Sequence, residues 1–358
     1  MEKCRTPHRP TRPALAAAST LEAKVAFLKS SDAYAEAPAR VEAVETHMSW
    51  VFLTDTHAYK LKKPVRYAYL DFSTIEARRL DCERELLLNR RLAADVYLGV
   101  IPLVLGAEDR LSVGGAGEVV DWLVQMRRLP AQRMLDYLIR NGTVEPAEIS
   151  RLARRLARFY AATAAEAITP ETYRQYLVKR VEANLQELTS PEFGLAKDVP
   201  ERLARFQLGF LETHAGLFDS RVRQGRIVEG HGDLRPEHVC LLPEPVVIDC
   251  LEFNREYRIL DPADELGYLA LECERLHAPE VGRWLLESYT EASGDAPPAA
   301  LLHFYQSWRA VLRATLAIWH LRDDGRHPHK KWVETTMEYL ELAQRHAAAA
   351  AAAAAAGS

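Results

Sequence analysis

The sequence has few cysteines, no long apolar run and little net charge. Its 358 residues include five cysteines, an odd number without any C-x-x-C pair. That spacing suits neither a disulfide framework nor a zinc site, so we expect a reducing, cytoplasmic environment. No stretch approaches the ~18 apolar residues of a membrane span, and the first residues lack the apolar core of a secretory signal. We therefore expect no membrane partner.

The charge balance argues against nucleic acid as a partner. The formal net charge is -4, which gives no overall basic field. With 48% hydrophobic and 27% charged residues, the chain can bury one large core or two moderate ones. We expect two lobes that perform small-molecule chemistry, and the pattern leaves the oligomeric state open.

Composition divides the chain into four parts. Residues 1–13 carry three Pro and four Lys or Arg and are expected to be a disordered lead-in, and residues 347–358 form a low-complexity tail, either a helix extension or an artificial addition. Residues 14–127 contain strand patterns such as "YLGVIPLVLG" and "VVDWLVQM" around one helical stretch, "FSTIEARRLDCERELLLNRRLA". Residues 128–346 are helical in pattern, with helices expected over 148–167, 172–188, 201–222, 263–289 and 299–321.

One loop inside the helical part carries chemistry. "HGDLRPEHVCLL" begins at His231, and "VVID" follows it, ending on Asp249. Taken singly, His231, Asp233 and His238 are common turn residues. Together, the loop and the strand "VVID" are expected to bring two carboxylates to one edge of a hairpin, where a divalent cation is the usual way to offset their repulsion.

This stretch resembles the catalytic loops of protein kinases and of the aminoglycoside phosphotransferase family, which read H-R-D-L-K-P-E-N and H-G-D-x-x-x-x-N. "DPADELGYLALE" resembles the family's D-P-A-x-D-L-A element. Upstream, "ETHMSWVFLTDTHAYKLKKPVRYAYLDFST" and "CERELLLNRRL" are similar to an uncharacterised bacterial branch that is often fused to a P-loop ATP-binding domain, although no G-x-x-x-x-G-K-[ST] occurs here. The resemblance implies an α+β, bilobal, protein-kinase-like fold, with a small antiparallel-sheet amino lobe and a helical carboxy lobe.

The resemblance also implies residue roles in phosphoryl transfer. Asp233 corresponds to the base that accepts the substrate hydroxyl proton, and Asp249 to the ligand of the metal that bridges the nucleotide phosphates. Arg235 takes the place of the loop Lys and is expected to brace the transferred group. His231 is expected to hold the loop rather than to react.

One position departs from the family. The loop normally ends in Asn, which gives an oxygen to a metal ion, whereas this chain has His238. Because Mg²⁺ prefers oxygen ligands and imidazole suits softer metals, the second metal site is in question. Glu237 is a possible substitute; the alternatives are a single metal, or nucleotide binding without transfer.

The amino lobe supplies the expected nucleotide-binding residues. "AYK" ending at Lys60 resembles the strand whose Lys grips the phosphates, with Lys62 as the alternate and a solvated strand edge as the competing interpretation. Glu85 is the expected partner of this lysine, with Glu83 as the second choice. The competing interpretation is that these glutamates belong to an ordinary charged helical face. "ETHMSW" has no glycine, so Thr46 and Ser49 are the candidates for phosphate contacts. Backbone near Met126 is expected to meet adenine.

The expected function is therefore transfer of the ATP γ-phosphate, with Mg²⁺ or Mn²⁺, to a hydroxyl of a small molecule such as a sugar or an aminoglycoside-like metabolite. Only "CLEFNREYRIL" separates Asp249 from Asp261, too short for a protein-kinase activation segment. The alternative is a catalytically weak nucleotide-binding pseudokinase that acts as a regulatory module.

The acceptor site is the least defined part. "FYQSWRAVLRATLAIWHL" places Arg309 and Arg313 on one helical face. The arginines either belong to an ordinary amphipathic helix and pair with acids, or meet an anionic substituent of the acceptor while Glu265 or Glu272 orients a hydroxyl. Two arginines there favour a neutral or anionic acceptor.

Overall fold

The protein is described by a computed structural model that covers residues 15, 18, 20–67, 70–106, 109–322 and 329–357. The predicted lead-in at 1–13 lies outside these residues. The chain divides into two compact units, Met1–Ala131 with Val246–Arg255, and Gln132–Pro245 with Glu256–Ser358. The segment that carries Asp249 thus belongs to the first unit, whereas the sequence had placed it in the carboxy lobe.

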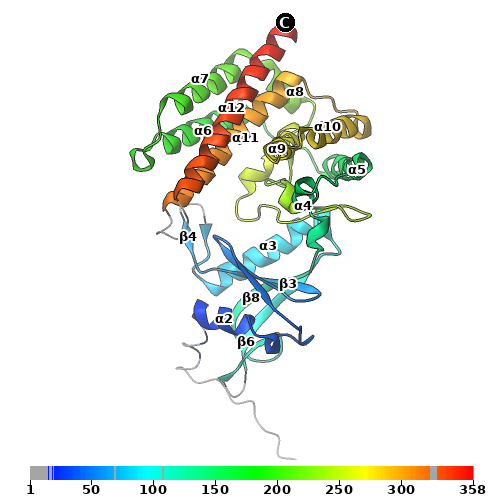
Figure 1. Cartoon of the computed structure of the whole chain (residues 1–358), viewed down its shortest axis with the longest axis vertical. Helices are drawn as coiled ribbons and strands as arrows, with labels where there is room; N and C mark the ends of the chain where they lie inside the picture. Colours follow the sequence, from blue (N-terminus) through cyan, green and yellow to red (C-terminus); the bar gives the residue numbers. More distant parts are fainter. Residues whose placement is uncertain are drawn as a thin grey trace, which may run out of the picture. The chain divides into compact units, whose positions relative to one another are not determined.

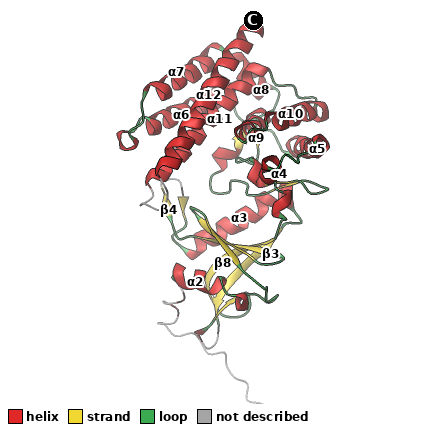
Figure 2. Cartoon of the chain, viewed as in Figure 1, coloured by secondary structure: helices red, strands yellow, loops and turns green. Residues whose placement is uncertain are grey.

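The first unit is built on an antiparallel six-stranded sheet of order β1-β2-β3-β8-β6-β7 (Figures 1 and 2). Its strands are β1 (Glu42–Glu45), β2 (Ser49–Leu53), β3 (His57–Lys62), β6 (Tyr97–Leu105), β7 (Leu111–Val113) and β8 (Glu118–Arg127). The remaining elements are α2 (Leu21–Leu28), η1 (Ser31–Ala33), the hairpin β4 (Arg66–Tyr67) and β5 (Leu70–Asp71), α3 (Ile75–Ala93) and β11 (Val246–Val247).

Strand periodicity sets which side chains of the sheet are buried. Phe52 and Leu61 are fully buried, with Leu123, in the core of this unit. Because side chains alternate along a strand, Lys60 and Lys62 share the opposite face of β3. Helix α3 packs against β6 and β8, and it begins after Thr74, whose hydroxyl accepts a hydrogen bond from the Ala77 N–H at 3.1 Å.

The buried face of α3 is largely polar. The helix lies where it was expected, but its Leu80 and Leu87 are 48% and 71% exposed. The residues it buries include Asp81, Glu85 and Asn89. The helix therefore presents polar groups to the interior of this unit, which requires partners for each of them.

The second unit is helical (Figure 2). Its helices are α4 (Leu135–Arg140), α5 (Pro146–Ala162), α6 (Pro170–Leu188), α7 (Asp198–Thr213), α8 (Ala215–Arg223), α9 (Pro262–Arg275), α10 (Pro279–Ser293), α11 (Ala299–Trp319) and α12 (His329–Gly357). Short strands β9 (Val228–Glu229) and β12 (Ile259–Leu260) pair with each other, and the loop with the HGD motif lies between β9 and β10 (Val239–Cys240), with η5 (Pro236–His238) before β10.

Two predicted helices are interrupted. The pattern over 201–222 runs through His214, which leaves the helical conformation at φ -116° and ψ 31° and separates α7 from α8. The pattern over 263–289 breaks between α9 and α10, where His277 has a φ of 63°. Apolar periodicity continues across both breaks, so the pattern alone merges the helices. Residues 347–357 continue α12.

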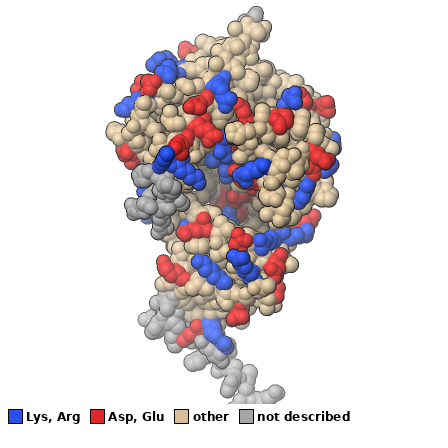
Figure 3. Space-filling model, in the orientation of Figure 1, with Lys and Arg blue, Asp and Glu red and all other residues tan. Residues whose placement is uncertain are grey.

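Charged side chains of both signs are intermixed on the face of the helical unit shown in Figure 3. This agrees with the small net charge of -4. Among the described residues, no helix is long and apolar enough to cross a membrane.

Candidate functional site

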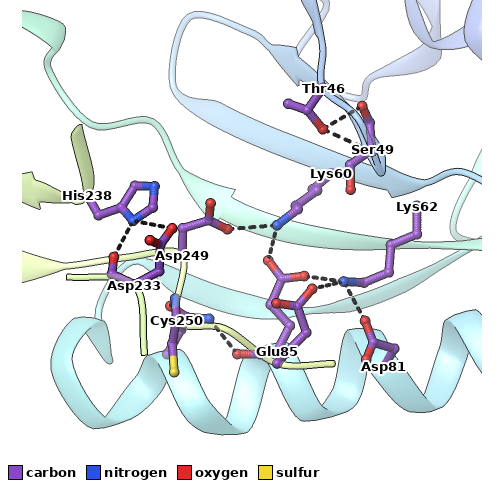
Figure 4. Close-up of polar contacts among 12 residues, drawn as sticks. Thr46, Ser49, Lys60, Lys62, Asp81, Glu85, Asp233, His238, Asp249 and Cys250 are labelled. Carbon is purple, nitrogen blue, oxygen red and sulfur yellow. Dashed lines mark hydrogen bonds and ion pairs between the residues drawn. The ribbon is translucent and has the colours of Figure 1, made fainter. Parts of the chain in front are cut away.

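In the first unit, Lys60 lies between two carboxylates (Figure 4). Its Nζ donates to Glu85 Oε1 of α3 and to Asp249 Oδ1, both at 2.9 Å. Glu85 is fully buried, whereas the Asp249 side chain is 47% exposed. Burial would lower the pKa of Lys60, but Asp249 and Glu85 raise it well above its usual value. The structure thus brings the predicted lysine, Lys60, together with its expected partner Glu85 and with the predicted metal ligand Asp249.

Lys62 has a different environment on the same strand face. Its Nζ lies 2.7 Å from Glu85 Oε2, 2.7 Å from Asp81 Oδ2 and 2.5 Å from Glu252 Oε1, and the side chain is 1% exposed. Burial lowers its pKa, and Glu252 and Glu85 raise it well above the usual value. Lys62 is therefore enclosed by acids, and Lys60, with 13% of its side chain exposed, is the more accessible lysine. The second-choice partner Glu83 pairs with Arg79 at 2.5 Å.

Asp249 is held in a strained backbone conformation. Its φ is 59°, in the left-handed region that non-glycine residues rarely adopt. The Asp249 N–H donates to the Tyr97 hydroxyl at 3.1 Å, and the Cys250 N–H donates to Asn89 Oδ1 at 2.8 Å. Side chains from β6 and α3 thereby fix a conformation that costs free energy, which is typical of functional sites.

In the second unit, the HGD loop surrounds Asp233 with donors. Tyr268 Oη donates to Asp233 Oδ1 at 3.1 Å, and Arg235 Nε lies 3.1 Å from the same oxygen. Burial would raise the pKa of Asp233, but Arg235, His238 and Arg313 lower it to about 2. Asp233 is therefore a carboxylate at neutral pH, and it can orient a hydroxyl and accept its proton as a weak base.

The buried carboxylate of Glu265 on α9 holds the loop backbone. Both of its oxygens accept the His231 N–H at 3.0 Å, Oε1 accepts the Gly232 N–H at 2.5 Å, and Oε2 accepts the Tyr160 hydroxyl at 2.7 Å. Gly232 has a φ of 90°, which a side chain would disfavour. One of the two interpretations of the late helix had Glu265 or Glu272 orient the acceptor hydroxyl; the structure shows Glu265 fully buried under the loop. The only signal for this role was its position in the D-P-A-x-D-L-A element.

His231 is also part of this support. Its side chain is buried, and its Nδ1 accepts the Asp233 N–H at 3.3 Å. The ring therefore helps to fix the backbone that carries Asp233.

His238 closes the loop from the other side (Figure 4). Its Nδ1 lies 2.8 Å from the Asp233 carbonyl oxygen, which only accepts, so Nδ1 carries the proton. The lone pair then resides on Nε2, which accepts from Arg235 at 3.2 Å. This hydrogen bonding uses both ring nitrogens within the loop. A metal ligand role for His238, as predicted, requires the Arg235 contact to give way.

The two arginines that were candidates for the acceptor site both form ion pairs with buried acids. Arg309 is 2% exposed, and its Nε and Nη2 each donate to Asp264 at 2.7 Å. Arg313 Nε lies 3.3 Å from Glu272 Oε1, and Glu272 is 1% exposed. For Arg309 and Glu272 the amphipathic-helix interpretation is therefore the one that matches the structure.

The remaining candidates lie in the sheet. Ser49 is 3% exposed at the start of β2, and its N–H and C=O both bond to Thr46 across the turn. The Thr46 hydroxyl is thus engaged within the turn itself. Met126 is 8% exposed near the end of β8, opposite Ala58 of β3. A nucleotide contact at Ser49 or Met126 stays a prediction.

Asp249 is the residue beside Lys60 whose carboxylate could hold a hard divalent cation. Among the described residues, no three or more His, Cys, Asp or Glu side chains are grouped as a preformed metal site. The Asp249 carboxylate is the half-exposed oxygen donor beside Lys60, and oxygen is the donor that Mg²⁺ prefers. Asp249 therefore offers one oxygen ligand of the kind that a hard divalent cation takes.

Comparisons with known proteins agree with this architecture. No family model matches the chain. It is 35% identical over 277 residues to the uncharacterized protein Rv2004c of Mycobacterium tuberculosis, and equally to the uncharacterized protein Mb2027c of Mycobacterium bovis. The alignment covers 76% of this chain and 54% of each relative, so the chain spans about half the length of the curated relatives it matches.

Solved structures show the fold. A choline/ethanolamine kinase family protein from Mesorhizobium loti superposes with a TM-score of 0.53 at 17% identity, covering 91% of this chain and 98% of that one. An ethanolamine kinase from Plasmodium vivax gives a TM-score of 0.51 at 10% identity, covering 85% and 81%. The chain thus has the protein-kinase-like fold of these proteins, with an antiparallel-sheet amino lobe and a helical carboxy lobe, as predicted.

Proposed function

We propose that this chain is an ATP-dependent phosphotransferase that phosphorylates a hydroxyl of a small molecule. The observation that carries the proposal is Lys60, fixed between the buried Glu85 and the half-exposed Asp249, in a chain with a protein-kinase-like fold. A partly exposed lysine held by a buried helix carboxylate is suited to bind phosphate oxygens at a set position. The HGD loop and the D-P-A element favour the aminoglycoside phosphotransferase-like branch.

The proposed reaction is a direct displacement. The acceptor hydroxyl oxygen forms a bond to the γ-phosphorus of ATP, the bond from that phosphorus to the β,γ-bridging oxygen breaks, and ADP leaves. The hydroxyl proton passes to the Asp233 carboxylate and then to solvent. Because the transition state is stabilised mainly by position and charge, the residues act by orientation and electrostatics.

The first unit supplies the nucleotide-binding side chains in this proposal. Lys60 binds phosphate oxygens, Glu85 fixes Lys60, and Lys62 fixes Glu85. Asp249 would hold a Mg²⁺ or Mn²⁺ ion, which when bound neutralises phosphate charge. The backbone near Met126 would meet the adenine edge, and Ser49 would approach the phosphates through its turn.

The second unit supplies the acceptor chemistry. Asp233 orients the hydroxyl, and Tyr268 restrains the carboxylate through its 3.1 Å hydrogen bond. Arg235 would contact the transferred group, where a planar guanidinium suits phosphate oxygens. His231 and His238 act as positioning residues for the loop.

The test is transfer of labelled γ-phosphate from ATP to a panel of hydroxyl compounds, with ATP binding measured in parallel by calorimetry. We expect wild-type protein to bind ATP with Mg²⁺ and to phosphorylate an acceptor, and Lys60→Met to lose both. Binding without any transfer would favour the nucleotide-binding module instead. Absence of ATP binding would contradict both interpretations.

A further inference from the structure

Arg180 on α6 is a cation without an acidic partner. Its guanidinium carbon lies 3.9 Å from the centroid of the Tyr176 ring, 4.9 Å from that of Tyr257 and 5.7 Å from that of Trp308. Its Nη2 donates to the Glu256 carbonyl oxygen at 3.1 Å. Within the described part of the chain, no carboxylate forms an ion pair with it. Three aromatic rings and a carbonyl thus hold the guanidinium, and the Asp264 carboxylate offsets its charge without forming an ion pair with it.

Two other arginines of the helical unit, unlike Arg180, have acidic partners. Arg309 is paired bidentately with Asp264, and Arg313 lies 3.3 Å from Glu272. Burial lowers the pKa of Arg180 to about 10, and the nearby charge of Arg309 acts in the same direction. The surroundings therefore disfavour the positive charge, although cation–π contacts offset part of the cost.

A second donor at this place also lacks an acceptor. Trp308 on α11 is 1% exposed, and its indole Nε1 has no hydrogen-bond partner among the described residues. A buried donor without an acceptor costs free energy in the unliganded protein. Arg180 and Trp308 both have N–H groups that an anionic oxygen would satisfy.

The place is connected to the catalytic carboxylate by direct contacts. The Arg309 guanidinium carbon lies 4.8 Å from the centroid of the Trp308 ring and 4.9 Å from that of Tyr268. Tyr268 in turn donates to Asp233 Oδ1 at 3.1 Å. A continuous chain of side-chain contacts through Trp308, Arg309 and Tyr268 thus links Arg180 to Asp233 within the helical unit.

We infer that Arg180, caged by Tyr176, Tyr257 and Trp308, binds an anionic group of the phosphate acceptor. This rests on the proposed phosphotransferase function and adds the substrate class to it: a hydroxylated small molecule that carries a carboxylate or a phosphate. A cationic amino alcohol would meet like charge from Arg180 and Arg309. Of the neutral or anionic acceptor predicted from the sequence, the anionic alternative is kept, with Arg180 in place of Arg309 as its binding residue.

The test uses acceptor probes matched in skeleton and different in charge. One set is glycerate, glycerol and aminopropanediol, and the other is gluconate, glucose and glucosamine. Acceptor-stimulated release of ADP is measured for wild type, Arg180→Met, Arg180→Lys and Lys179→Gln. Met keeps the packing of the arginine stem without its charge. Lys179 is the exposed neighbour on the same helix, so its variant controls for a general loss of positive charge.

We expect the anionic member of at least one set to stimulate ADP release most. Arg180→Met should raise KM for that member by about 10- to 100-fold, the usual effect of losing a charge-assisted contact, with kcat changed less. Arg180→Lys should restore part of the loss, and Lys179→Gln should stay close to wild type. The Tm of Arg180→Met should equal or exceed that of wild type, because the variant removes a desolvated charge that has no ion-pair partner among the described residues.

Preference for the neutral or cationic members would overturn the inference while leaving the phosphotransferase function in place. The same holds if Arg180→Met keeps the wild-type KM, or if it lowers Tm by several degrees, as a purely structural arginine would. A protein that binds ATP but responds to no anionic member also contradicts it. Failure to bind ATP at all would instead overturn the proposed function.

Discussion

The surroundings of Lys60 and those of Asp233 have opposite charge balances. In the first unit, Lys60 and Lys62 are contacted by four carboxylates, those of Asp81, Glu85, Asp249 and Glu252. In the second unit, a single carboxylate, Asp233, has its pKa lowered by Arg235, His238, Arg313 and His231. Two lysines are thus contacted by several acids in the first unit, whereas one acid is flanked by several basic side chains in the second, of which Arg313 also pairs with Glu272.

This difference matches the division of labour in the proposed reaction. An excess of carboxylates leaves room for one more cation, as expected where nucleotide arrives with a divalent metal ion. An excess of bases suits a place where negative charge develops on a transferred phosphoryl group and where an anionic acceptor binds. Variants in the two regions should therefore differ in which step they impair.

The largest expected effect concerns the acid of the second unit. Asp233→Asn should lower kcat by about 10²- to 10⁴-fold, because a positioned base is lost, while ATP affinity is kept. The measurement is acceptor-dependent ADP release together with calorimetric ATP binding. Asp198→Asn, at an exposed site on α7, is the control variant. A folded Asp233→Asn protein with wild-type kcat would rule out the assigned role.

The second prediction contrasts the two lysines of β3. Lys62→Met should lower the free energy of unfolding by about 3–5 kcal/mol, since it strands buried carboxylates. Lys60→Met should cost about 1 kcal/mol or less, because Glu85 keeps Lys62 and Asp249 is half-exposed, yet it should abolish ATP binding. Urea unfolding of both variants tests this. If both variants lose the same free energy of unfolding, Lys60 contributes to stability as much as Lys62 does.

The smallest effect is the pH dependence of stability that Asp233 contributes. Its pKa is about 2 in the folded protein against a usual value of 3.8, so its charge stabilises the fold above the unfolded pKa and this contribution is lost as pH falls through the folded pKa. The difference in unfolding free energy between wild type and Asp233→Asn should be constant between about pH 5 and 8 and change in favour of the variant below about pH 4. A difference that does not vary down to about pH 3 would contradict the lowered pKa.

Much of the fold was predictable from periodicity and motif. The helix expected over 148–167 is α5, which buries Ile149, Leu152, Leu156 and Phe159. The strand patterns "YLGVIPLVLG" and "VVDWLVQM" became β6 and β8. The break at His214 was not predictable, because the apolar pattern continues through it, whereas Pro279 at the start of α10 marks the break at His277 in the sequence.

The candidate site was likewise predictable only in part. The pairing of Lys60 with Glu85 joins residues that a motif marks. The polar face of α3 and the role of Glu265 are invisible to hydrophobic patterning, since both consist of buried charges whose partners lie far away in sequence. Arg180 carries no motif at all, and only the three rings around it reveal its environment.

The central claim is that a metal ion bound to Asp249 balances the excess of carboxylates in the first unit. ATP affinity with and without Mg²⁺ tests this claim most directly. Asn at position 249 tolerates the left-handed conformation found there, at a φ of 59°, so Asp249→Asn changes the charge with little effect on the backbone. Calorimetry should show that Mg²⁺ tightens ATP binding to wild type and has little effect on Asp249→Asn. An equal gain from Mg²⁺ in both proteins would contradict the account.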